Sequence, residues 1–108
     1  MLRKIYLIVA FALVTTFAFA QTGTLKGVIT DAMSGDPIPF ANIVAERNGN
    51  QTGGTTTDFD GNYTIKPLEP GTYTVKATFV GYGAVEITGV IISANKITEQ
   101  NVTLQEGV

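Results

Sequence analysis

Short runs of alternating apolar and polar residues, broken by Gly, Pro, Asn and Asp, make up the sequence from Thr22 onward. A period of two sends successive side chains to opposite faces of a strand, whereas a helix that covers a core repeats its apolar residues every three to four positions. No stretch beyond Thr22 has the helical spacing. The pattern therefore predicts an all-β chain.

Seven segments qualify as strands, and the clearest of them begins at Tyr73. There Tyr73, Val75, Ala77 and Phe79 alternate with polar residues, so we expect Tyr73 and Phe79 in the core. Residues 48–54 read as a loop, and residues 58–62 as the turn of a hairpin. Because a parallel sheet usually needs crossover helices, the segments predict a seven-stranded antiparallel β-sandwich. The expected strands are 24–31, 40–47, 55–57, 63–66, 73–79, 85–93 and 98–104.

The first 20 residues have the layout of an export signal. A basic start precedes an unbroken apolar run over residues 5–14, and Ala-Phe-Ala at 18–20 supplies the small residues that a signal peptidase reads. An uncleaved anchor is the alternative, but residues 5–20 fall short of the roughly 20 that span a bilayer. We expect cleavage between Ala20 and Gln21, with residues 1–20 as signal peptide and 21–108 as one domain. The domain would be exported to the periplasm, outer membrane or cell surface, with membrane contact only through the uncleaved signal.

The chain contains no His and no Cys. It therefore has no Ser-His-Asp or Cys-His nucleophile, no disulfide, and no zinc or copper site with imidazole or sulfur ligands. A pair of carboxylates could in principle act as acid and base, but the strand pattern places the acids in loops or facing solvent. We expect no enzymatic activity, no catalytic residues and no cofactor. The net charge of −2 offers no basic field for nucleic acid, so we expect no nucleic-acid partner.

Asp58, Asp60 and Asn62 are spaced like the first ligands of a calcium loop. Gly61 stands at the fourth place instead of the sixth, however, and no helices are predicted on either side. We therefore expect a turn in which the Asp side chains accept hydrogen bonds from nearby backbone N–H groups, and keep these three residues only as weak metal candidates.

Five ordered motifs, which cover residues 27–31, 34–43, 54–63, 70–73 and 79–82, resemble the carboxypeptidase regulatory-like domain. The resemblance extends over residues 24–104 and implies a transthyretin-like (prealbumin-like) sandwich. The motifs are most similar to those of Bacteroidetes proteins, in which this domain often precedes the plug and barrel of TonB-dependent outer-membrane receptors. The resemblance implies a domain without activity of its own that serves folding, docking or interaction.

Two classes of function remain in view, a structural or protein-interaction module and a carbohydrate-binding module. The contacts expected are loops or an exposed strand edge. Asn48 and Asn50 lie in the predicted loop, and Phe59 and Tyr82 lie in turns where they could be exposed. Since a lone turn aromatic more often covers its own core, we favour a protein partner, such as receptor components of the outer membrane, over a saccharide.

Overall fold

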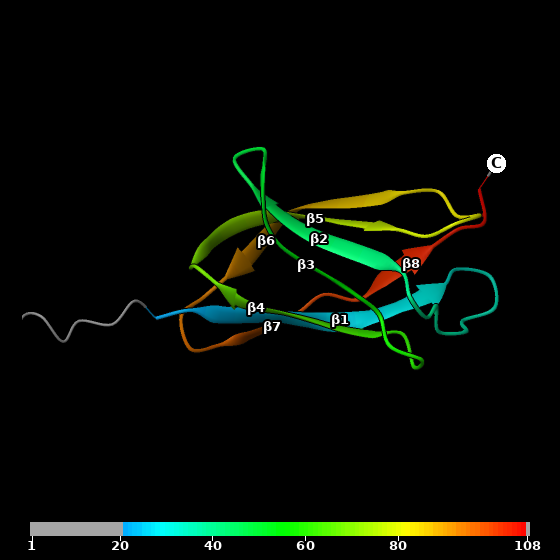
Figure 1. The fold of residues 1–108 in the computed structure, drawn as a ribbon, viewed down its shortest axis with the longest axis horizontal. Coiled ribbons are helices and arrows are strands. Elements are labelled where there is room, and N and C mark those ends of the chain that lie inside the picture. The colour runs from blue at the N-terminus through cyan, green and yellow to red at the C-terminus, as the bar shows by residue number, and fades with distance from the viewer. Residues whose placement is uncertain (1–20, 108) are drawn as a thin grey trace, which may run out of the picture.

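The computed structural model describes residues 21–107, and all regular structure in this range is β-strand (Figure 1). The predicted all-β class is thereby confirmed, while the predicted signal segment lies outside the described residues. No helix in the described range is long and apolar enough to cross a membrane. The strands in this range are β1 (Gly23–Asp31), β2 (Asn42–Arg47), β3 (Asn50–Thr56), β4 (Asn62–Leu68), β5 (Gly71–Thr78), β6 (Val85–Ile92), β7 (Ile97–Glu99) and β8 (Val102–Leu104).

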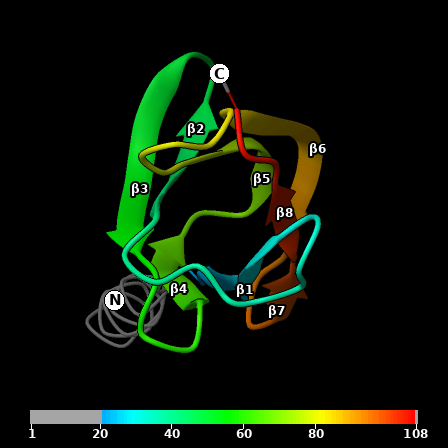
Figure 2. The ribbon, with the colours of Figure 1, turned by 90° about the vertical axis from the view of Figure 1, so that its right-hand side faces the viewer.

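Two sheets pack face to face as a sandwich (Figure 2). The first sheet has the order β4-β1-β7, with β8 also paired to β1, and the second has the order β3-β2-β5-β6. The predicted antiparallel sandwich is confirmed except at its last strand, because both β7 and β8 run parallel to β1. The physical reason is that the whole second sheet lies between β1 and β7 along the chain and acts as the crossover that a helix would otherwise provide.

The predicted last strand, 98–104, is divided into β7 and β8, which makes eight strands in the described range instead of seven. At the division the backbone N–H of Gln100 donates to the carbonyl of Lys26 at 2.8 Å. The side-chain oxygen of Asn101 then accepts the N–H of Val28 at 3.0 Å and replaces a backbone partner. A side-chain amide thus completes the hydrogen bonding of β1 where the neighbouring strand is interrupted.

The predicted loop 48–54 is instead a tight hairpin between β2 and β3. Asn48 and Gly49 both have positive φ, 54° and 78°, as the Asn-Gly pair favours in a two-residue hairpin turn. The polar and glycine-rich sequence of β3 concealed this strand. The predicted hairpin at 58–62 is also wrong, since this turn connects β3 in the second sheet to β4 in the first.

The core lies between the sheets, and the alternation predicted much of it. Tyr73 is confirmed as a core residue, with 2% of its surface exposed. Phe79 is only partly buried and packs against the edge of the core, because β5 ends at Thr78 and the next residue already belongs to a loop. The buried apolar residues are Leu25, Ile29, Ile38, Ala41, Ile43, Ala45, Tyr63, Ile65, Leu68, Tyr73, Val75, Ala77, Val90, Ile92, Val102 and Leu104.

Candidate functional site

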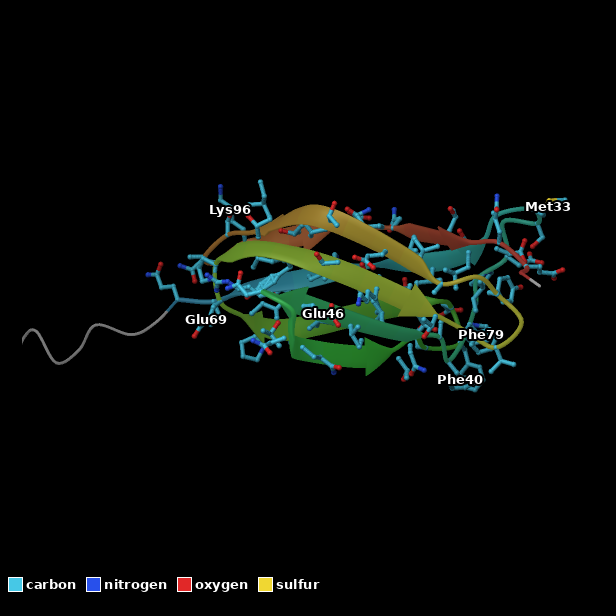
Figure 3. All side chains as sticks on the ribbon, turned by 90° about the horizontal axis from the view of Figure 1, so that it is seen from above. Met33, Phe40, Glu46, Glu69, Phe79 and Lys96 are labelled. Atoms are coloured by element: carbon cyan, nitrogen blue, oxygen red, sulfur yellow. The ribbon has the colours of Figure 1, made fainter. Side chains whose placement is uncertain are left out.

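Three loops and the end of the described chain gather at one end of the sandwich. We call residues 32–41, 57–61, 79–84 and 105–107 the loop end. Figure 3 shows Met33, Phe40 and Phe79 there, with Glu69 and Lys96 at the opposite end. An isolated β-bridge between Tyr82 and Glu106 joins the last two of these segments. The strands therefore bring together loops that are far apart in the sequence.

The loop end carries most of the exposed large apolar side chains. Met33 is 91% exposed, Phe40 56%, Phe59 78% and Val80 89%, and the other two exposed side chains of this kind lie in β6 and β7. Phe40 and Phe59 pack edge to face, with ring centroids 5.1 Å apart and planes at 77°. Exposed apolar surface concentrated at one end of a domain is a common mark of an interaction site.

Phe40 has a φ of 59°, a left-handed conformation that is rare for a bulky side chain. Its N–H donates to the carbonyl of Thr57 at 3.0 Å, and the N–H of Ala41 donates to Thr57 Oγ1 at 2.9 Å. The hydroxyl of Thr57 in turn donates to the carbonyl of Ile38 at 2.6 Å. Thr57 is buried, so a fixed hydrogen-bond network holds Phe40 in this backbone conformation, with its ring beside Phe59.

Replacing Thr57 by valine should lower the free energy of unfolding by about 1–3 kcal/mol, because the shape is kept while two buried backbone groups lose their partner. Urea unfolding monitored by circular dichroism measures the loss. Thr64→Val is the matched control, since Thr64 is exposed on β4, and it should shift stability by less than about 0.5 kcal/mol. Equal midpoints for the two variants would contradict this role of Thr57.

Tyr82, which was expected in a turn where it could be exposed or cover its own core, is partly buried and packs against the core. Its hydroxyl donates to Asp31 Oδ2 at 2.7 Å, and its ring centroid lies 6.0 Å from that of Phe79. Asp31 ends β1 and is buried, which corrects the expectation that all acids face solvent or lie in loops. Its other oxygen accepts the N–H groups of Met33 at 2.8 Å and Ser34 at 3.0 Å. The pair is therefore a structural tie between β1 and the 79–84 loop.

The hydrogen bonds of this pair move both pKa values. The N–H of Ser34, the Tyr82 hydroxyl and the N–H of Met33 lower the pKa of Asp31 below its ordinary 3.8. The hydrogen bond to Asp31, with burial and the negative charge of that carboxylate, raises the pKa of Tyr82 to about 12. Folding is therefore favoured by an ionised Asp31 and a neutral Tyr82.

Acid should weaken the domain as Asp31 becomes protonated. A lowered pKa in the folded state means that the stabilisation is present above 3.8 and is lost as the pH falls through the folded value. Thermal melts at a series of pH values should show the melting temperature declining below about pH 4. Asp31→Asn, measured over the same series, should show a shallower decline, and an acid decline identical to that of the unchanged protein would refute the assignment.

The 58–62 turn has the geometry expected of a self-bonded Asp. Asp58 Oδ1 accepts the N–H groups of Asp60 and Asn62, each at 2.9 Å, and Gly61 has a φ of 77°. Within residues 21–107, no group of three or more acidic residues lies close enough to hold a metal ion. Asp58 and the N–H groups of Asp60 and Asn62 thus take part in shaping the turn that presents Phe59.

The four candidate contact residues do not form one site. Phe59 and Tyr82 lie at the loop end, whereas Asn48 and Asn50 lie in the β2–β3 hairpin at the other end of β2. Sequence reasoning missed Phe40, which it assigned to a strand. The prolines at 37 and 39 were an available signal, since proline fits poorly in a paired strand and indicates a later start.

The sequence of residues 24–105 matches the family model of the carboxypeptidase regulatory-like domain. The chain belongs to this family. TonB-dependent receptor SusC of Bacteroides thetaiotaomicron is 33% identical over 87 residues, which cover 81% of this chain and 8% of the receptor. TonB-dependent transporter Oar of Myxococcus xanthus is 38% identical over 79 residues, 69% of this chain and 7% of the transporter. The chain thus spans a small part of the length of both relatives.

Solved structures with the same fold come from proteins of several kinds. A chain of a type II cohesin-X-dockerin complex from Acetivibrio cellulolyticus is 30% identical in sequence and has a TM-score of 0.59. The match covers 79% of this regulatory-like domain and 58% of that chain. The 5-hydroxyisourate hydrolase of Klebsiella pneumoniae has a TM-score of 0.58 at 16% identity, over 80% of this chain and 92% of that chain. At that identity the likeness shows the fold alone, and it confirms the predicted transthyretin-like sandwich.

Proposed function

We propose that this regulatory-like domain is a non-enzymatic interaction module that is exported, with cleavage before Gln21, and works in a TonB-dependent receptor-like system at the outer membrane or in the periplasm. It binds a protein partner through the loop end. The observation that carries the proposal is the exposed Phe40–Phe59 pair, held in place by the buried hydrogen bonds of Thr57. The relationship to SusC and Oar supports the setting.

A rigid, exposed aromatic pair is suited to anchoring a protein surface. Aromatic side chains provide large contact area at low entropic cost and are enriched among the residues that dominate binding energy. A folded domain gains nothing in its own stability from exposing Met33 and Val80, which belong to the same end of the sandwich as this pair. The same four side chains, covered by a partner, would form the apolar centre of an interface.

The arrangement supports binding by a protein better than by a saccharide. With planes at 77°, the two rings do not form a common flat surface on which a sugar ring could lie. It also supports binding over catalysis, because the buried carboxylate of Asp31 is already bonded to Tyr82 and to two backbone amides. A carboxylate engaged in this way is held in the ionised state and serves the fold.

Site-specific photocrosslinking in the native cells tests the proposal with the full chain and its own leader. Benzoylphenylalanine at position 59 should form an adduct with a protein of the envelope fraction. The same probe at Thr72, exposed on the outer face of β5, should not. Mass spectrometry of the purified chain should find Gln21 as the first residue. Absence of an adduct from position 59, or equal adducts from both positions, would refute the proposal.

A further inference from the structure

The loop end carries acidic side chains but no basic ones. Four exposed acids, Asp36, Asp58, Asp60 and Glu106, belong to the loop end. The sequence of its four segments contains no Lys or Arg. In residues 21–107 the basic side chains are instead in the strands or at the opposite end, and Figure 3 shows Lys96 far from Met33. The basic side chains in this range are Lys26, Arg47, Lys66, Lys76 and Lys96.

The ion pairs found between described residues also lie away from the loop end. Lys76 Nζ is 3.1 Å from Glu46 Oε2, and Arg47 is 3.8 Å from Glu69. Within the described range, therefore, none of the loop-end acids is in an ion pair. Their charges add to a negative field that repels anionic lipid and nucleic acid and attracts a cation.

Two of these acids, Asp58 and Asp60, flank one ring of the aromatic pair in the sequence, and this combination selects a particular kind of cation. Phe59 stands between Asp58 and Asp60 in the sequence and is largely exposed. A guanidinium within about 6 Å of an aromatic ring is attracted to its face, and it can also bond a carboxylate in the plane of its N–H groups. The apolar stem of an arginine can lie against neighbouring apolar surface, such as the ring of Phe40 beside Phe59.

We propose that the loop end binds a cationic and apolar segment of a partner protein, in which an arginine lies over Phe59 beside the carboxylate of Asp60 and an apolar side chain contacts Phe40. This inference rests on the proposed function and adds the chemistry of the partner to it. Asp58 attracts the arginine by its charge but does not bond it directly, since one of its oxygens already accepts hydrogen bonds from the turn. The association should be accelerated by charge and weakened by salt.

A short synthetic peptide that alternates arginine and phenylalanine is a suitable probe. It would be titrated into the ¹⁵N-labelled full chain, expressed with its leader and purified from the envelope fraction. Amide resonances of residues 40, 59–61 and 79–82 should shift, and those of the β2–β3 hairpin should not. Raising the salt concentration from about 50 mM to about 300 mM should weaken binding severalfold, because salt screens the attraction between exposed charges.

Single substitutions assign the two parts of the contact. Phe59→Ala should weaken binding of the peptide by about tenfold or more, as expected of a central aromatic anchor. Asp60→Asn should weaken it by about twofold to fivefold, the usual range for an exposed charge pair. Glu99→Gln is the matched control, because Glu99 is exposed on β7, outside the loop end, and it should leave binding unchanged. Thermal melts of all three variants should match that of the unchanged protein, since these side chains are exposed.

Several outcomes would overturn the inference. A peptide with glutamate in place of arginine that binds equally well would show that cationic charge is not selected. A saccharide such as maltohexaose that shifts the same resonances at lower concentration, or a concentration-dependent dimer in sedimentation, would give the loop end a different occupant. If position 59 crosslinks to an envelope protein but the peptide does not bind, only the partner chemistry fails. If neither occurs, the proposed function fails with it.

Discussion

Replacing Gly27 by alanine should lower the free energy of unfolding by about 3 kcal/mol, at the upper end of what overpacking costs. A Cβ atom at this position of β1 would collide with the carbonyl oxygen of Gln100 and would lie 2.9 Å from Cε1 of Tyr63. Neither neighbour is free to move. The backbone N–H of Gln100 donates a hydrogen bond to the carbonyl of Lys26, and the Tyr63 hydroxyl donates one to the carbonyl of Gln100.

Urea unfolding followed by far-ultraviolet circular dichroism measures this loss, and Gly83→Ala is the matched control. A Cβ atom at Gly83 would meet only the carbonyl oxygen of Gln105, at an ordinary 3.9 Å. That variant should differ from the unchanged protein by less than about 1 kcal/mol. Equal urea midpoints for Gly27→Ala and the control would show that the carbonyl oxygen of Gln100, between β7 and β8, does not lie close against Gly27.

Leu25→Asp should prevent folding altogether. Leu25 has no exposed surface, so the substitution removes about 1.5–3 kcal/mol of apolar burial and places a carboxylate in the core without a partner. A domain with a total stability of about 5–15 kcal/mol does not tolerate both losses. Loss of the β-sheet circular dichroism signal and rapid digestion by a protease would report it.

Thr64→Asp provides the control for Leu25→Asp, because Thr64 is exposed on β4 and pairs with Lys26, whose charge favours the new carboxylate. It should remain folded. Phe79→Asp should fall between the two, although strand alternation predicts Phe79 to be as buried as Tyr73. Partial burial lets a charge at position 79 reach water, so a folded but less stable domain is expected. A folded Leu25→Asp variant would contradict the inward face assigned to β1.

The strand pattern predicted burial well where the strand was long and paired on both sides. In β5, Tyr73, Val75 and Ala77 all face the core as the alternation indicates, because two β neighbours hold the strand extended along its length. It failed in β3, whose polar and glycine-rich residues carry no alternation of hydrophobicity. There the pairing with β2 forms the strand, and Gly53 leaves room for Ile65 from the other sheet.

The candidate site was predicted only in part, and for a physical reason. Phe59 stands out in the sequence as an aromatic residue in a turn, and the structure places it at the surface. Its neighbour Phe40 does not stand out in the sequence, because the left-handed backbone that presents it depends on hydrogen bonds to Thr57, 17 positions away. Tyr82 could not be recognised as a partner of Asp31 for the same reason, with 51 positions between them.

By itself, the sequence determined the all-β class, the inward residues of the longer strands and the family, because alternation, turn residues and motifs are properties of neighbouring positions. Tertiary structure alone decided that β7 and β8 run parallel to β1, and that apolar and acidic side chains from separate loops meet at one end. These features depend on contacts between distant residues, which form only when the two sheets close on a shared core.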